Sequence, residues 1–160
     1  MRIALVYFSF FPAVGGIERT VWKIGESLVE NGHDVQVLTT GSIAFKKSDL
    51  PRDEIINGMH IKRFSYREIP GYKYTFFSTE LVKYLWSRPV DIVHVFSYLP
   101  VFLTNAACVV ARLRGLPLVV TPVYNPGRSS QYKGIFQRTG GFLYDRVVGP
   151  RVLRLANAVT

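Results

Sequence analysis

The sequence predicts an α/β fold of the Rossmann-like, doubly wound type, with a mainly parallel sheet of about six or seven strands. Short apolar runs alternate along the 160-residue chain with segments whose apolar residues recur at helical spacing. The first run, the helix after it and the next run together need only about forty residues, the length of a right-handed crossover between parallel strands. This alternation places helices on both faces of one sheet.

The first crossover has clear boundaries. The run "RIALVYF" predicts a buried strand from Arg2 to Phe8. A signal peptide has a similar start, but here only one arginine precedes the apolar run and no small-residue cleavage site follows it, so we favour the strand. An amphipathic helix is predicted from Ile17 to Glu30, with Gly32 as its left-handed cap, and "DVQVLTT" is the second strand.

The middle of the chain is less regular. We interpret "AFKKSDLPRDE" and "SYREIPGYKY" as loops. The segment between them, "IINGMHIKRF", is interpreted as a hairpin or short strand around Asn57 and Gly58. A helix is predicted from Thr75 to Ser87, with Leu81 and Leu85 on one face.

The alternation then resumes. "VDIVHVF" and "LPLVVTP" are predicted strands, and the helix between them runs from Leu99 to Arg114 and is capped by Gly115. A loop rich in glycine, proline, serine and asparagine leads into a helical stretch from about Ile135 to Leu155, and the chain closes on "NAVT". The one cysteine, Cys108, excludes an internal disulfide and is interpreted as a buried structural thiol.

Three of the predicted strands end on one rim, near Ser9, Ser97 and Pro122. Doubly wound sheets bind ligands at this carboxyl edge. Gly15 and Gly16 lie in the loop after the first strand, where glycines let a ligand approach the backbone and the next helix offers free N–H groups to an anion. A tight turn that touches no ligand is the alternative. The dinucleotide fingerprint G-x-G-x-x-G and the P-loop are both missing.

The net charge of +9 is unevenly distributed. From Arg112 to Arg154 there are eight lysines and arginines against one acidic residue, Asp145. This balance favours anionic partners such as phosphates, acidic lipid or an acidic domain, and a solvated basic surface explains it equally well. No apolar stretch reaches the ~18 residues of a membrane-spanning helix, so we expect a soluble, cytoplasmic domain.

Four segments carry a resemblance to a known family. "FFPAVGGIERTVWKIGESLVENGHDVQVLTT" joins a Pro-containing loop, Gly-Gly, Glu, a long helix, Gly-His-Asp and a strand that ends in Thr. "RPVDIVHVFSYLP", "RLRGLPLVVTPVYNP" and "RLANAVT" follow it along the chain. In this order and at this spacing they resemble the N-terminal domain of retaining GT-B glycosyltransferases of the family 4 type.

The resemblance implies that residues 1–160 form a single acceptor-side domain, the N-terminal half of a two-domain transferase. The sugar of a UDP- or GDP-sugar would pass to an acceptor with retained anomeric configuration, without a metal or a tightly bound cofactor. The residues implied on the donor side of the cleft are Gly15, Gly16, Glu18, His94, Tyr124 and Asn125. Those implied on the acceptor or phosphate side are Arg19, Arg128 and Lys133.

The sequence departs from the family pattern at three places. Phe96 stands where a second histidine often follows, and His94 itself fits a core histidine bonded to the backbone as well as a site residue. Val123 stands where a histidine often points at the donor sugar, so Tyr124 or Asn125 would take over that contact. The chain stops at Thr160, before the family's Glu-x7-Glu motif, so we expect no transfer from this domain alone.

Two alternatives from other classes remain open. One is a stand-alone α/β domain that binds a phosphate or nucleotide at the Gly-Gly loop, and the other is one subunit of a two-chain transferase. The segment from Phe64 to Phe77 adds a further question, because it holds six aromatic residues among basic neighbours. It suits an acidic membrane interface and a lipid-linked acceptor, or else its aromatics belong to the core. Base stacking on nucleic acid has no supporting motif.

Overall fold

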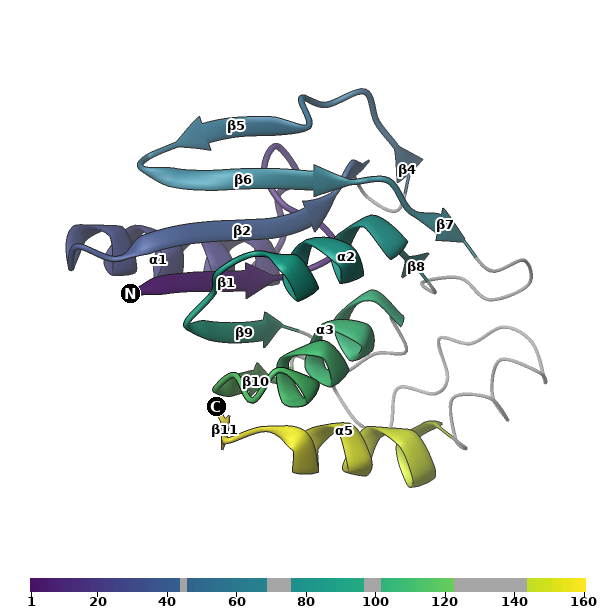
Figure 1. Cartoon of the computed structure of the whole chain (residues 1–160). Coiled ribbons are helices and arrows are strands. Elements are labelled where there is room, and N and C mark those ends of the chain that lie inside the picture. Colours follow the sequence, from purple (N-terminus) through teal and green to yellow (C-terminus); the bar gives the residue numbers. More distant parts are fainter. Residues whose placement is uncertain (44–45, 69–75, 97–101, 123–143) are drawn as a thin grey trace.

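A seven-stranded sheet with helices on both faces organises the chain (Figure 1). The structure is a computed structural model that describes residues 1–43, 46–68, 76–96, 102–122 and 144–160. The strand order is β11-β10-β9-β1-β2-β6-β5, and all neighbours are parallel except β5, which is antiparallel to β6 at one edge. The strands are β1 (Arg2–Val6), β2 (Asp34–Thr40), β5 (Asp53–Ile56), β6 (Met59–Phe64), β9 (Ile92–Phe96), β10 (Leu118–Thr121) and β11 (Ala158–Val159).

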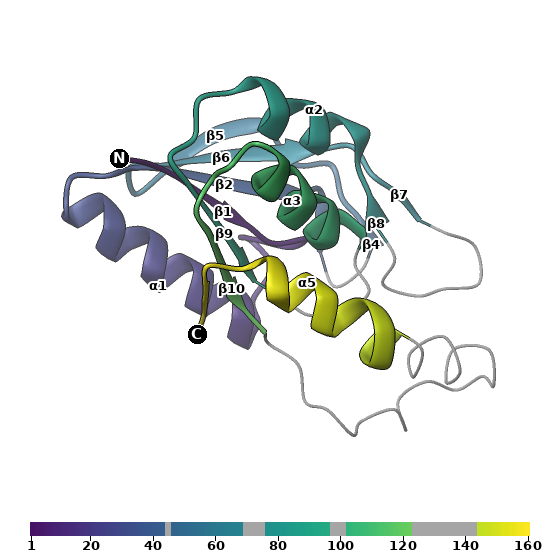
Figure 2. The same cartoon turned by 60° about the horizontal axis from the view of Figure 1, so that its bottom comes forward.

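The helices divide between the two faces of the sheet. The helix α1 (Gly16–Glu30) joins β1 to β2 and covers one face. The other face carries α2 (Thr79–Ser87), α3 (Phe102–Leu113) and α5 (Gly149–Leu155), with α3 lying between its two neighbours (Figures 1 and 2). A π-helical turn, η2 (Tyr144–Val148), leads into α5. Strand order reverses at β1, so the predicted doubly wound α/β architecture is confirmed.

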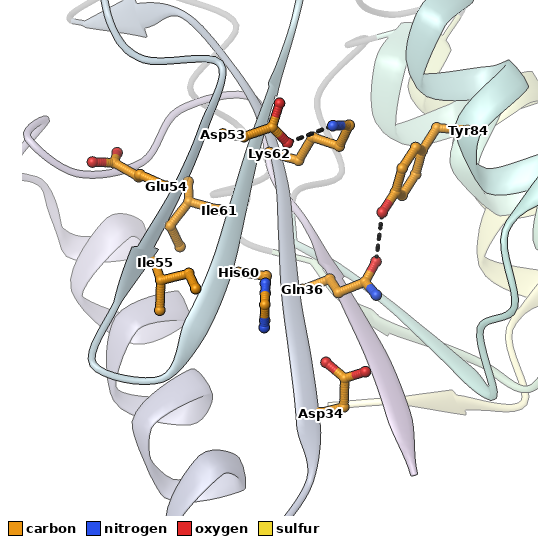
Figure 3. Close-up of a pocket in the computed structure, with 9 residues that line it drawn as sticks. All are labelled: Asp34, Gln36, Asp53, Glu54, Ile55, His60, Ile61, Lys62 and Tyr84. Carbon is orange, nitrogen blue, oxygen red and sulfur yellow. Dashed lines mark hydrogen bonds and ion pairs between the residues drawn. The ribbon is translucent and has the colours of Figure 1, made fainter.

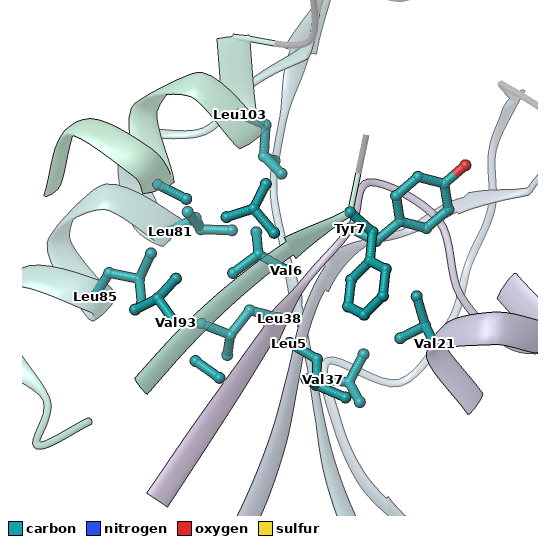
Figure 4. Close-up of a cluster of buried hydrophobic side chains, with 14 of the residues drawn as sticks. Leu5, Val6, Tyr7, Val21, Val37, Leu38, Leu81, Leu85, Val93 and Leu103 are labelled. Atoms are coloured by element: carbon teal, nitrogen blue, oxygen red, sulfur yellow. The ribbon is translucent and has the colours of Figure 1, made fainter. Parts of the chain in front are cut away.

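The core has two layers, one on each side of the sheet (Figure 4). Leu5 and Val37 point toward Val21 of α1, whereas their chain neighbours Val6 and Leu38 point toward the opposite helices. Successive side chains of a strand face opposite sides, so a sheet covered on both faces needs continuous apolar strands such as β1. This is the physical reason for the run "RIALVYF".

Local signals at the element ends are confirmed. Gly32 and Gly115 adopt the left-handed region, with φ of 77° and 67°, directly after α1 and α3. Asn57 (φ 49°) and Gly58 (φ 78°) form the turn of the β5–β6 hairpin, as the sequence predicts. Ser78 begins α2 by accepting a 3.2 Å hydrogen bond from the Leu81 amide.

Two segments that we interpret as loops contain short strands. In "AFKKSDLPRDE", β4 (Lys46–Lys47) pairs with β3 (Ser42–Ile43), and Asp53 already belongs to β5. In "SYREIPGYKY", β7 (Arg67–Glu68) pairs with β8 (Phe76–Phe77). The helix predicted from Thr75 therefore begins only at Thr79. Strands of two residues are too short for a detectable period and depend on a partner strand.

Candidate functional site

The carboxyl ends of β1, β9 and β10 form one rim. Val6 pairs with Val95, and Val95 pairs with Val120, so the three parallel strands end at a common level. This arrangement confirms the rim that the sequence predicts. The loop from β1 to α1 starts there and contains the two adjacent glycines.

Gly15 and Gly16 have different surroundings at the start of α1. Gly15 is the N-cap residue in extended conformation (φ −150°, ψ 178°), and the Glu18 carboxylate lies where a Cβ on Gly15 would be. Apart from its two chain neighbours and the backbone of α1 itself, a Cβ on Gly16 would meet no heavy atom within 4 Å. The first amides of a helix have no partner within the helix. The backbone at Gly16 is therefore open to a ligand, and an anion is the ligand that a helix N-terminus favours.

An apolar pocket of about 280 Å³ adjoins these glycines. The Trp22 ring stacks on buried Phe10 at a centroid distance of 5.7 Å and contacts Phe11 at 5.5 Å. The carboxylate of Glu18 and the guanidinium of Arg19 supply its charged groups. The pocket is lined by Phe11, Ala13, Val14, Glu18, Arg19 and Trp22. Such a pocket can hold an apolar group next to polar atoms that orient a hydroxyl.

Arg63 supports this loop from below, and the sequence analysis does not single it out. Its side chain is only 3% exposed and donates hydrogen bonds to the carbonyl oxygens of Phe11 (2.6 Å) and Pro51 (2.9 Å). It also forms an ion pair with Glu54. The alternation of side chains along β6 could have identified Arg63. It follows Met59 and Ile61 at every second position and therefore lies on the face that α1 covers. An arginine on an inward face needs buried partners.

His94 lies within β9, level with Leu5, and not in a rim loop. Its Nε2 lies 2.8 Å from the Thr121 hydroxyl, which lies 2.6 Å from the hydroxyl of Thr160. The ring stacks on Phe96 at 4.1 Å. Burial lowers the pKa of His94 to about 4, so the imidazole is neutral at pH 7. The histidine thus takes part in a side-chain hydrogen-bond chain that links the middle of β9 to the ends of β10 and β11.

Tyr7 is a second residue that the sequence analysis does not select. It follows β1, is almost fully buried and belongs to the layer beneath α1 (Figure 4). Burial raises the pKa of its phenol, and the negative charge of Glu18 raises it further. A neutral phenol therefore lies near the Glu18 carboxylate at the base of the glycine loop.

Comparison with known proteins identifies the family of the chain. Residues 15–160 match a family described as a glycosyl transferase 4-like domain. The chain belongs to this family. A stretch of 64 residues, 39% of the chain, is 41% identical to an uncharacterized glycosyltransferase of Methanocaldococcus jannaschii and spans 15% of that protein's length. The family resemblance expected from the four motifs is thereby confirmed.

The glycosyl transferase 4-like domain brings only some of the predicted site residues together. Gly15, Gly16, Glu18 and Arg19 share the first turn of α1 and its cap. His94 instead joins Thr121 and Thr160. Four predicted residues and the departure at position 123 lie outside the described residues: Tyr124, Asn125, Arg128, Lys133 and Val123.

A larger pocket of about 380 Å³ lies away from the glycine loop, toward the amino ends of β2 and β6 (Figure 3). The Tyr84 hydroxyl donates a 3.0 Å hydrogen bond to Gln36, and Lys62 forms an ion pair with Asp53. These polar groups already satisfy one another. Of the predicted site residues that the structure describes, none lines this pocket.

The aromatic segment from Phe64 to Phe77 is core at one end and exposed at the other. Phe64 is buried, Tyr66 packs against the core, and Phe77 is exposed at 39%; residues 69–75 lie outside the described part. No helix among the described residues is long and apolar enough to cross a membrane. Within the same residues there is no cluster of three or more potential metal-ligating side chains.

Proposed function

We propose that this domain is the acceptor-side half of a GT-B glycosyltransferase that uses a nucleotide sugar and retains the anomeric configuration. The observation that carries the proposal is the open backbone at Gly16, at the N-terminus of a helix on the carboxyl rim of the sheet. In the proposal, the amides there face the donor phosphates or the transferred sugar. UDP- and GDP-sugars are the donors to test, as substrates and not as resident cofactors.

The apolar pocket beside Gly16 is the proposed acceptor subsite. Phe11 and Trp22 would hold the apolar part of the acceptor, and Glu18 and Arg19 would orient its hydroxyl. An apolar lining suits a lipid-linked acceptor better than a free sugar. The enzyme would then work in the cytoplasm at a membrane face. His94, which is neutral, would act as a hydrogen-bonding group and not as a charge.

Stabilisation of the leaving diphosphate would come mainly from a second domain. Preorganised positive charge at the departing group is the largest single source of rate enhancement in such reactions. We therefore propose that residues 1–160 alone bind substrate weakly and do not transfer sugar. Sequencing the gene beyond the codon for Thr160 is the first test of the second domain. We expect an open reading frame that continues for the length of another domain and encodes a Glu-x7-Glu motif.

The decisive assay compares Gly16→Ala with Glu30→Ala in the complete gene product. Glu30 is exposed at the far end of the same helix and serves as the control. A methyl group at Gly16 occupies the space proposed for the ligand, so we expect kcat/KM to fall about tenfold or more. Equal activity of the two variants contradicts the site. Saturable nucleotide binding without any transfer favours a stand-alone binding domain, and activity that needs a separate chain favours a two-chain enzyme.

A further inference from the structure

The helix α3 is apolar on its outer side as well as on its inner side. Leu103, Ala107 and Ala111 face the core and are buried. The opposite side exposes Phe102 (47%), Val109 (44%) and Leu113 (69%), at a spacing of seven and then four residues. Along an α-helix, steps of seven and four residues return to within about 20° and 40° of the starting direction, so these side chains form one stripe. A helix that is hydrophobic all round is normally covered on both sides.

The neighbouring helices extend this apolar stripe into a broader face. α3 lies between α2 and α5 and packs against both (Figures 1 and 2). Trp86 of α2 is 54% exposed. It lies on a different side of the helix from Leu81 and Leu85, which are buried. We call the outer surface of α2, α3, α5 and η2 the α3 face. Its exposed apolar residues are Trp86, Phe102, Val109, Leu113 and Val148.

The α3 face is also strongly basic. Its exposed cations are Lys83, Arg112, Arg146, Arg151 and Arg154. The carboxylate of Glu80 at its edge accepts a hydrogen bond from the Ser65 amide and forms an ion pair with Arg52. From Leu81 to Thr160 the sequence has ten lysines and arginines against two aspartates. One of those aspartates, Asp91, is paired with Arg2 at the other end of the sheet.

We propose that the α3 face is a docking surface for an anionic lipid bilayer. A second copy of the chain would bring two basic faces together, and their charges would repel. Nucleic acid would match the charge but would leave the apolar stripe in contact with water. A bilayer with acidic headgroups matches both features, because apolar side chains enter the headgroup boundary while lysine and arginine meet the lipid phosphates. Tryptophan is enriched at that depth.

The docking geometry follows from the length of α3. Twelve residues rise about 18 Å, far less than the hydrocarbon thickness, so the helix lies along the surface and does not span it. The strand β8 (Phe76–Phe77), at the end of the aromatic segment, contacts α3, whereas Phe64 at the start of that segment is buried. The proposal goes beyond sugar transfer, and vesicle binding can be measured without any donor or acceptor. Its failure would leave the proposed transferase function untouched.

The test is co-sedimentation of the 160-residue chain with two kinds of vesicle, pure phosphatidylcholine and phosphatidylcholine with about a third phosphatidylglycerol. We expect binding only to the acidic vesicles, with loss at high salt. Arg151→Gln with Arg154→Gln should weaken the partition coefficient roughly 25-fold, because each cation near such a surface contributes about fivefold. Leu113→Ser should weaken it roughly fivefold or more through lost apolar burial.

Matched controls make the result specific to the α3 face. Lys23→Gln with Lys47→Gln removes two exposed cations elsewhere, and Ile55→Ser removes an exposed apolar side chain (66%) on the edge strand. These variants should bind acidic vesicles within about twofold of the parent chain. Equal losses of vesicle binding in the test and control variants would overturn the proposal, because binding would then depend on the net positive charge of the chain and not on the α3 face. Absence of vesicle binding would overturn it too, as would a dimer that Leu113→Ser dissociates.

Discussion

The carbonyl oxygen of Phe11 accepts a 2.6 Å hydrogen bond from the guanidinium of Arg63, which lies 52 residues later in the chain. The contact joins the glycine loop to the β5–β6 hairpin through a nearly inaccessible cation. Because the same guanidinium also binds Pro51 and Glu54, the loop rests on a group that is fixed on several sides. The position of the proposed site thus depends on the far edge of the sheet.

Replacing Arg63 should therefore destabilise the domain. Arg63→Met keeps much of the side-chain volume but leaves the carbonyl oxygens of Phe11 and Pro51 and the carboxylate of Glu54 without their donor. We expect the free energy of unfolding to fall by about 2–3 kcal/mol, measured by urea denaturation. Arg67→Met, at an exposed position, is the matched control and should change it by less than about 0.5 kcal/mol. Equal stability of the two variants would show that the buried contacts contribute nothing.

Two glycines at the opposite ends of α1, Gly16 at its start and Gly32 just after its end, should respond differently to alanine. Gly32 has φ of 77°, where a Cβ is strained, so Gly32→Ala should cost about 1 kcal/mol of stability. Gly16 is the first helical residue with open space around it, so Gly16→Ala should leave stability unchanged or raise it by up to about 1 kcal/mol. Thermal unfolding of both variants checks this. A destabilised Gly16→Ala would assign the residue to the fold and not to a ligand.

The stability of the domain should fall in mild acid because of His94. Its native pKa is about 4, below the ~6.5 of an unfolded chain, so between these values the unfolded state binds the extra proton. This loss of folding stability is absent above about pH 6.5 and grows as the pH falls toward 4. His94→Gln removes this proton uptake. Its urea midpoint should change less than that of the parent between pH 6.5 and 4.5, and parallel curves would contradict the assignment.

Cys108 should be unreactive in the folded domain. The side chain is 1% exposed, and burial raises the pKa of its thiol to about 12. The thiolate is the reactive form, so alkylation by iodoacetamide at pH 8 should be very slow in the native protein and fast in urea. Mass spectrometry of timed samples measures both rates. Rapid native labelling would mean that α3 detaches from the sheet.

Much of the fold could be predicted because its signals are local. The helix α1 begins one residue before the predicted Ile17 and ends at the predicted Glu30. The hairpin at Asn57 and Gly58 follows from two residues that tolerate positive φ. The short strands β4 and β7 could not be predicted, since each exists only through its partner strand.

The site could be predicted less completely. The pair Gly15–Gly16 was predicted to lie on the rim and does so, because loop position follows from strand order. The sequence fits His94 equally well to a hydrogen bond with core backbone and to a role in the site; in the structure its partner is the hydroxyl of Thr121, a contact between two strands. Such contacts depend on sheet register, which no single segment of the sequence records.

The amino-acid sequence alone predicts the apolar strands, the helix periods and the left-handed caps at Gly32 and Gly115, and its four motifs together predict the family. The strands, the helix periods and the caps depend on residues within a few turns of one another, where steric and hydrophobic preferences act directly. Three features emerge only once the chain is packed: Arg63 supports Phe11, Phe11 and Trp22 line a pocket next to the glycine loop, and Leu113 faces outward. Burial is a property of the packed chain, because the same residue is costly or stabilising according to what covers it.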